Sequence, residues 1–88
     1  MAIYIVTYDI NHETAMPKIA AEIDATPWVP LSESSYAVET EENPEQLFKR
    51  FSKHLDENDH LLVLSVLKPF VGRHRTDVLE WLQARMPW

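Results

Sequence analysis

The chain opens with an apolar run, Ala2–Ile10, in which both alternating sets of positions are apolar. β-Branched and aromatic residues dominate this run, which predicts a central strand covered on both faces. After a polar turn, Thr14 is placed to cap a helix that carries Pro17 in its first turn. This helix is expected to stop at Pro27, because the residue before a proline avoids the helical conformation.

Two short strands are predicted next, over residues 28–31 and 35–40, with a serine-containing turn between them. Pro30 cannot donate a hydrogen bond to a neighbouring strand, so the first of these strands belongs at an edge of the sheet. In the second strand, Tyr36 and Val38 alternate with other residues and share one face. The two strands are therefore expected to form a hairpin.

The strongest boundary signal lies at the start of the second helix. Asn43 is a good cap, Pro44 suits the first helical position, and Gln46 stands three residues after the cap, as in a capping box. One side of this helix is expected to be a buried apolar stripe, and the other is expected to be the outer side. The stripe comprises Leu47, Phe48, Phe51 and Leu55, and the outer side carries Lys49, Arg50 and Lys53.

A last apolar run over residues 60–67 predicts a fourth strand. The order strand, helix, strand, strand, helix, strand is the split βαβ pattern, so we expect an α+β, ferredoxin-like domain over residues 1–70. Its four-stranded antiparallel sheet would carry both helices on one face, because such crossovers are right-handed. The other face would stay open, and we expect it to pack against another copy of the chain.

Residues 71–88 are expected to form a C-terminal helical extension that starts at Thr76 or Asp77. Apolar residues recur at helical spacing along it, and two tryptophans add aromatic surface. These residues are Val78, Leu79, Leu82 and Met86, with Trp81 and Trp88. We expect this helix to cover an exposed edge of the sheet or to hold a partner.

Composition limits the chain to one small domain. Its 88 residues are too few for two ordinary domains, and self-association would add burial that a small core lacks. The absence of cysteine excludes disulfides and thiolate chemistry and fits the cytoplasm, where we expect the protein. No run approaches the ~18 apolar residues of a membrane span, so no membrane contact is expected.

The charge is unevenly distributed. The net charge is −6, but residues 1–45 carry −8 and residues 46–88 carry +2. The acidic balance disfavours general phosphate binding by the whole surface. Any contact with nucleic acid or with an acidic partner must therefore come from the second half, where we single out Arg73, Arg75 and Trp81.

Asp9 is the sharpest candidate for chemistry, because a polar group at the end of a buried strand is costly unless it is paired. Its carboxylate can hold Mg²⁺ or Mn²⁺ while the ion keeps several waters, as phosphodiester hydrolysis requires. Two copies across a dimer axis would supply a pair of such carboxylates. His12, three residues later, can serve as general base or second ligand. In the architectural alternative, Asp9 accepts N–H bonds from the turn at residues 11–13.

Other common sites are excluded by the sequence. The histidines lack metalloprotease spacing, and the serines lack the flanking glycines of a nucleophile elbow. A single glycine, Gly72, rules out a glycine-rich phosphate loop. The sheet also lacks the basic and aromatic signature of an RNA-recognition motif.

Three stretches of the chain resemble CRISPR-associated protein 2 and a set of small bacterial and phage proteins related to it, often labelled "SinR family". They span most of residues 1–67 and comprise Thr7–Asn11, Leu31–Val38 and His54–Val63. The resemblance implies a ferredoxin-like homodimer that associates through its sheets. It also implies either a metal-dependent endonuclease that uses Asp9 or a non-catalytic bridge in a spacer-integration complex.

One segment departs from this family. The family typically has an arginine-rich segment after the strand-end aspartate, whereas residues 11–14 of this chain are not basic. We favour a homodimeric, metal-dependent endonuclease acting on RNA or DNA. The alternatives are a non-catalytic module that binds a protein through residues 81–88, in a phage-defence or toxin–antitoxin context, and an acidic inhibitor of a nucleic-acid-binding protein.

Overall fold

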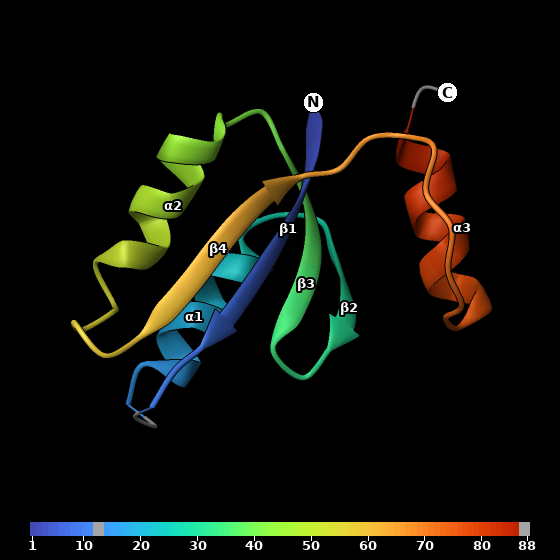
Figure 1. Cartoon of the computed structure of the whole chain (residues 1–88). Helices are drawn as coiled ribbons and strands as arrows, with labels where there is room; N and C mark the ends of the chain where they lie inside the picture. The colour runs from blue at the N-terminus through green and yellow to red at the C-terminus, as the bar shows by residue number, and fades with distance from the viewer. Residues whose placement is uncertain (12–13, 87–88) are drawn as a thin grey trace.

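The computed structural model describes residues 1–11 and 14–86. In chain order the elements are β1 (Ala2–Asp9), α1 (Met16–Asp24), β2 (Trp28–Ser32), β3 (Ser35–Thr40), α2 (Pro44–Ser52), β4 (His60–Ser65) and α3 (Thr76–Arg85) (Figure 1). Every element predicted from the sequence is present, within a few residues of its expected ends. No helix within the described ranges has the length and apolar character needed to cross a membrane.

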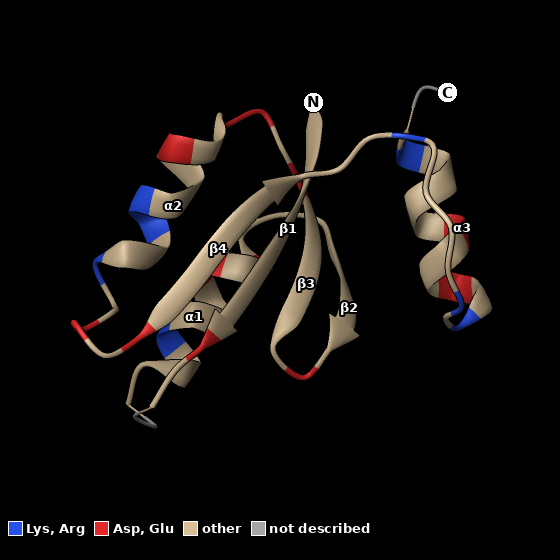
Figure 2. Cartoon of the chain, in the orientation of Figure 1, with Lys and Arg blue, Asp and Glu red and all other residues tan. Residues whose placement is uncertain are grey.

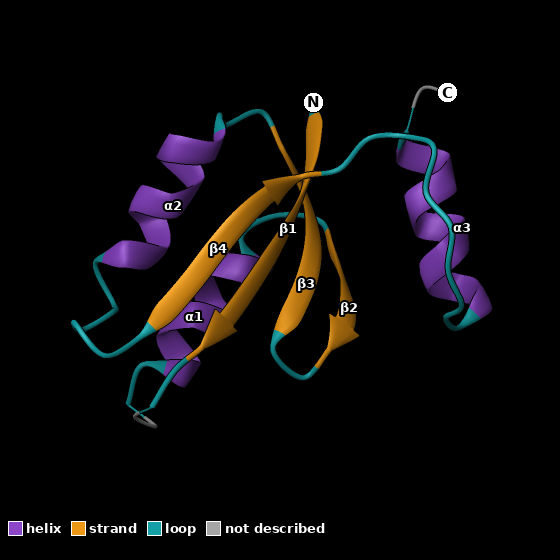
Figure 3. Ribbon diagram, viewed as in Figure 1, coloured by secondary structure: helices purple, strands orange, loops and turns teal. Residues whose placement is uncertain are grey.

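The four strands form one antiparallel sheet in the order β2-β3-β1-β4 (Figure 3). β1 is central, as its apolar run predicts. Val6 lies opposite Tyr36 of β3 on one side and opposite Val63 of β4 on the other. β2 and β4 are the two edges of the sheet.

Pro30 confirms the predicted edge position of β2. It lies opposite Tyr36 of β3, and the register shifts between Pro30 and Ser32. The N–H of Glu39 donates to the carbonyl of Pro27, so these two residues form a hydrogen-bonded pair. Hydrogen-bonded and non-hydrogen-bonded pairs alternate along the strands, and Pro30 therefore falls in a non-hydrogen-bonded pair, with its nitrogen facing away from β3. The proline and the irregular register both weaken this edge as a template for another strand.

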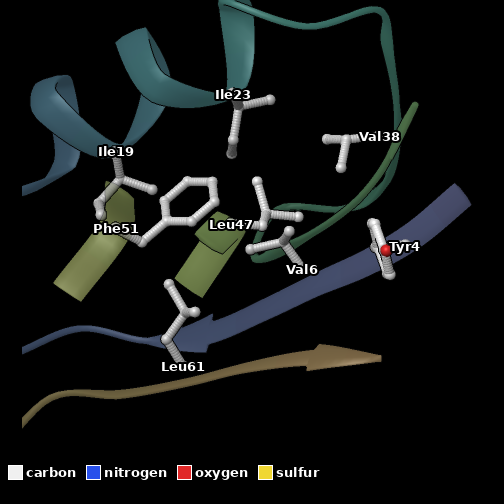
Figure 4. Close-up of a cluster of buried hydrophobic side chains, with 8 residues drawn as sticks. All are labelled: Tyr4, Val6, Ile19, Ile23, Val38, Leu47, Phe51 and Leu61. Carbon is white, nitrogen blue, oxygen red and sulfur yellow. The ribbon is translucent and has the colours of Figure 1, made fainter. Parts of the chain in front are cut away.

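Helices α1 and α2 cover the same face of the sheet, as expected for two right-handed crossovers. Their apolar side chains meet alternate residues of the strands in the main core (Figure 4). The buried members of this core are Tyr4, Val6, Ile19, Ile23, Val38, Leu47, Phe51 and Leu61. This packing follows from the two-residue period of the strands and the three-to-four-residue period of the helices.

The opposite face of the sheet is only half open. Val78 and Leu82 of α3 pack against Ile3, Val29 and Ala37 in a second buried cluster. The prediction of a fully open face was wrong here, because the segment after β4 carries α3 across to the β2 side (Figure 1). Within the described residues, no helix covers the part of this face at β4 and at the end of β1.

The start of α2 agrees with the cap predicted from the local sequence, whereas the start of α1 does not. The capping box of α2 is confirmed: the Asn43 side chain accepts from the N–H of Gln46 at 2.8 Å, and the Gln46 side chain accepts from the N–H of Asn43 at 2.9 Å. The predicted cap of α1 was wrong. That helix begins at Met16 with Ala15 as its N-cap, so Thr14 lies one residue too early.

Two side chains of α2 lie differently from the prediction. Phe48 is 41% exposed, whereas Leu47 and Phe51 of the same predicted stripe are fully buried. Arg50 does not project from the outer side. It is half buried against Glu22 of α1 and Glu42, which precedes α2.

Candidate functional site

Asp9 lies at the last position of β1, opposite His60 of β4, and its side chain is exposed. Successive residues of a strand point to opposite faces, so Asp9 shares a face with Thr7 and Ile5. This is the face that α3 only half covers. The carboxylate is therefore accessible to solvent and to a partner seated on the sheet.

The turn after β1 is held by the loop before β4. The N–H of Asn11 donates to Oδ1 of Asp59 at 3.1 Å, and Nδ2 of Asn11 donates to the carbonyl of Asn58 at 2.8 Å. The loop is braced in turn by the N–H of Asp56, which donates to Oδ2 of Asp59 at 2.9 Å. At Asn11, therefore, the architectural alternative does not apply, because its N–H bonds to Asp59 instead of Asp9. His12 lies outside the described residues.

A second carboxylate lines the same hollow as Asp9. A hollow of about 340 Å³ is bounded by Tyr8, Asp9, Ile10, Met16, Glu33 and Ser34. The hydroxyl of Tyr8 donates to the carbonyl of Glu33 at 3.2 Å and ties the β2–β3 turn to β1. Glu33 is not among the residues predicted from the sequence, although its position follows from the topology. β3 runs antiparallel to β1, so the turn before β3 lies beside the end of β1.

The metal donors near Asp9 are few. Within residues 1–11 and 14–86, no three histidine or acidic side chains gather closely enough to hold a metal ion. Two of the described histidines are engaged elsewhere: His54 binds Glu22 at 2.8 Å, and His74 binds the carbonyl of Leu31 at 2.8 Å. His60, in contrast, is exposed and lies directly opposite Asp9. Asp9 and Glu33 are the carboxylates that would hold an ion there.

The three residues singled out for nucleic-acid or partner contact lie near α3 but are not equivalent. Arg73 is exposed in the connection before α3. Arg75 is exposed and pairs with Asp77 at 3.1 Å. Trp81 is half buried against the second cluster, and the guanidinium of Arg85 lies 4.1 Å from the centre of its ring. The structure thus brings none of them next to Asp9.

The outer side of β4 is one of the two free edges of the sheet. Val66 donates its N–H to the carbonyl of Ile3, so these two residues form a hydrogen-bonded pair. Along β4, hydrogen-bonded and non-hydrogen-bonded pairs with β1 alternate from this point. The backbone groups of Leu61, Val63 and Ser65 therefore face away from β1; we call them the β4 edge. Beside them, α2 and β4 enclose a hollow of about 680 Å³, whose apolar lining includes Phe48 and Leu62.

Comparisons with models of protein families, with curated proteins and with solved structures find no match for this chain. The resemblance to CRISPR-associated protein 2 therefore rests on the three sequence stretches that carry it.

Proposed function

We propose that this chain is a ferredoxin-like, CRISPR-associated protein 2-like homodimer that works as a non-catalytic interaction module. The fold assignment is supported by the element order and by the strand order β2-β3-β1-β4, with α1 and α2 on one face. The observation that carries the function is the β4 edge, because it offers unpaired backbone groups beside exposed apolar side chains.

Apolar side chains flank the β4 edge on both faces of the sheet. Leu62 is 63% exposed and Leu64 is 45% exposed on the face that α3 leaves open, and Phe48 is exposed on the helical face. An exposed apolar strand edge is a site for strand addition, and soluble proteins normally guard such edges with charges or prolines. β2 is guarded by Pro30, whereas β4 contains no proline, aspartate, glutamate, lysine or arginine.

A second copy suits this edge because two β4 strands can pair antiparallel about a two-fold axis. The pairing would join two sheets into one of eight strands. It would cover Leu62 and Leu64, and it brings no like charges into opposition. Self-association would also supply the additional burial that a chain of 88 residues lacks.

The oligomeric state tests this proposal. Sedimentation equilibrium at micromolar concentration is expected to give a dimer for the unmodified chain and a monomer for Leu62→Lys. The matched control is Val71→Lys, because Val71 is 99% exposed and lies outside the strand. Circular dichroism checks that both variants fold. A monomeric unmodified chain, or a Leu62→Lys variant that stays dimeric, would rule the β4 edge out as the dimer interface.

A metal-dependent endonuclease is the second candidate, favoured by the exposed carboxylate of Asp9 at the hollow that Glu33 also lines. Mg²⁺ is commonly held by one or two carboxylates and several waters, and the bound ion would supply an activated water for phosphodiester cleavage. Labelled RNA and DNA are incubated with Mg²⁺, with Mn²⁺ and with chelator. This candidate requires metal-dependent cleavage that Asp9→Asn abolishes and Asp77→Asn leaves intact.

A further inference from the structure

Three aromatic side chains form a row between α1 and the β2–β3 hairpin. The rings of Tyr8 and Tyr36 stack with centroids 6.3 Å apart, and Trp28 meets Tyr36 edge-on at 5.5 Å. Burial, followed by the neighbouring Tyr36, raises the pKa of Tyr8 to about 12, so its hydroxyl is neutral at physiological pH. Trp28 is still 38% exposed, so the row ends in an accessible indole.

Two adjoining hollows follow this row. One, of about 330 Å³, lies between α1 and the rings of Trp28 and Tyr36, and the other is the hollow that Asp9 and Glu33 line. Tyr36 and Pro17 line the first hollow, and Tyr8 and Met16 line the second. The two hollows adjoin, because Tyr8 stacks on Tyr36 and Met16 precedes Pro17 in α1. We call them together the acidic aromatic groove, lined by Tyr8, Trp28, Tyr36, Asp9, Asp24 and Glu33.

The groove is negatively charged throughout. Asp24 accepts a hydrogen bond from Nε1 of Trp28 at 3.0 Å, which holds the indole in place. Among the described residues, neither Asp9, Asp24 nor Glu33 takes part in an ion pair, and no basic residue lines either hollow. Lys18 precedes Glu22 by one helical turn and so shares its side of α1, which faces α2.

An exposed indole and two partly buried phenol rings beside carboxylates match the chemistry of a guanidinium group. Arginine stacks on aromatic faces and pairs with carboxylates through a planar fork, whereas the ammonium of lysine is a strongly hydrated point charge. The same chain contains an internal example. Arg85 lies 4.1 Å from the centre of the Trp81 ring and 3.5 Å from Oε1 of Glu39. The groove offers the same two kinds of partner at the surface.

We propose that the acidic aromatic groove binds arginine side chains on an extended basic segment of a partner protein. Charge complementarity selects this occupant, because the carboxylates repel nucleic acid and the aromatic lining favours a cation with a flat apolar face. The hollow at Trp28 and Tyr36 lies on the β2 side of the sheet, whereas the hollow at Asp9 lies at the end of β1, the strand next to β4. No residue that lines either hollow belongs to β4, so the proposal does not require a dimer.

The test uses the full chain and a capped pentapeptide, Gly-Arg-Gly-Arg-Gly, as the probe. Heteronuclear NMR titration is expected to shift the indole N–H of Trp28 and the amides of Asp24 and Glu33 in a saturable manner. Binding should weaken as salt is raised. A lysine peptide of the same length is expected to bind several-fold more weakly, and a peptide with neutral citrulline in place of arginine is expected not to bind.

Variants locate the binding to the groove. Trp28→Ala is expected to weaken binding roughly tenfold, the order of effect of losing one cation–π contact. Glu33→Gln, in an exposed turn where folding is not at risk, is expected to weaken it about threefold. Glu80→Gln removes the same charge from an exposed position of α3 and should change nothing. Equal binding of the citrulline peptide, shifts centred away from Trp28, or equal losses in Glu33→Gln and Glu80→Gln would overturn the proposal.

Discussion

Arg50 joins three segments of the chain that are distant in sequence. Its Nε lies 2.8 Å from Oε2 of Glu42, and its Nη1 lies 3.1 Å from Oε1 of Glu22 and 3.0 Å from the carbonyl of Glu22. His54 and Lys53 approach the same Glu22 carboxylate at 2.8 and 3.3 Å. Glu22 and Arg50 are both less than a quarter exposed. The network thus fixes α2 against α1 on the helical face.

Replacement of Arg50 by Met is expected to destabilise the fold by roughly 2–3 kcal/mol, because two partly buried carboxylates lose their main partner. The value is below that of a fully buried pair, since solvent reaches part of the network. Urea unfolding followed by circular dichroism measures the change. Lys49→Met is the control on the same helix, and its effect should stay within about 0.5 kcal/mol. Equal effects would contradict a structural role for Arg50.

The acid response of the fold should depend on Glu22. The hydrogen bond with His54 lowers the pKa of Glu22 most, and the hydrogen bonds with Arg50 and Lys53 lower it further, against the opposing effect of burial. A carboxylate whose pKa is lower in the folded chain stabilises the fold above the unfolded pKa of about 4.3. That contribution is lost as the pH falls through the lowered folded pKa.

Glu22→Gln is therefore expected to destabilise the fold by about 1–2 kcal/mol at pH 7, and by progressively less below about pH 4. Urea unfolding of both proteins from pH 7 to pH 3 measures the difference. Glu57→Gln, at an exposed loop position, should show no such convergence. A difference that stays constant over this range would show that the Glu22 charge does not contribute.

At the scale of elements, α3 decides how much of the sheet remains open. Val78 is fully buried, and Met86 is 6% exposed in the same cluster. The helix is also fastened at its start. Nε2 of His74 bonds to the carbonyl of Leu31, while Nδ1 of His74 accepts from the N–H of Arg75 at 2.9 Å. A ring that donates through Nε2 and accepts through Nδ1 is neutral.

Val78→Ala is expected to cost about 2–3 kcal/mol of stability, since it removes two buried methyl groups and leaves a cavity. Val71→Ala, at a 99% exposed position just before α3, should stay within about 0.5 kcal/mol. Both variants are compared by urea unfolding. A Val78→Ala variant as stable as the control would mean that α3 does not pack on the sheet.

The elements also show what the sequence could predict. The start of α2 follows from Asn43, Pro44 and Gln46 because all capping partners lie within three residues. The burial of Arg50 could not be predicted in this way, since Glu22 is 28 residues away and reaches it only after the sheet has formed. The docking of α3 is likewise set by contacts with distant strands, which helical periodicity does not reveal.

Of the candidate site, one residue could be predicted from the sequence and its neighbours could not. The position of Asp9 at the end of β1 follows from the apolar run before it, and the structure confirms that position. Glu33 and the aromatic row depend on the pairing of β1 with β3, which places Tyr8 beside Tyr36. Local patterns therefore located the strand-end carboxylate, whereas its neighbours required the sheet topology.

At the scale of the whole molecule, the groove runs from the β2–β3 hairpin to the end of β1, and the β4 edge lies beyond β1. The acidic β2–β3 turn lies away from β4, whereas the acidic end of β1 lies beside the start of β4 (Figure 2). A dimer joined at the β4 edge would therefore turn the Trp28 end of both grooves outward. Each copy would keep that end accessible, so that one dimer presents two sites to a partner.

Thermal unfolding should then depend on protein concentration, because a dimer that unfolds to separate chains is favoured by mass action. A tenfold rise in concentration is expected to raise the Tm by about 4 °C. It changes the free energy of unfolding by ~1.4 kcal/mol per dimer, and this value divided by the unfolding entropy of two chains of this length gives the shift in Tm. Calorimetry of the unmodified chain and of Leu62→Lys measures this dependence. The variant is expected to show a constant Tm, because the charged side chain blocks the apolar contact beside the β4 edge. The same slope in both proteins would place the dimer contact elsewhere, and no slope in the unmodified chain would mean that association contributes nothing to its stability.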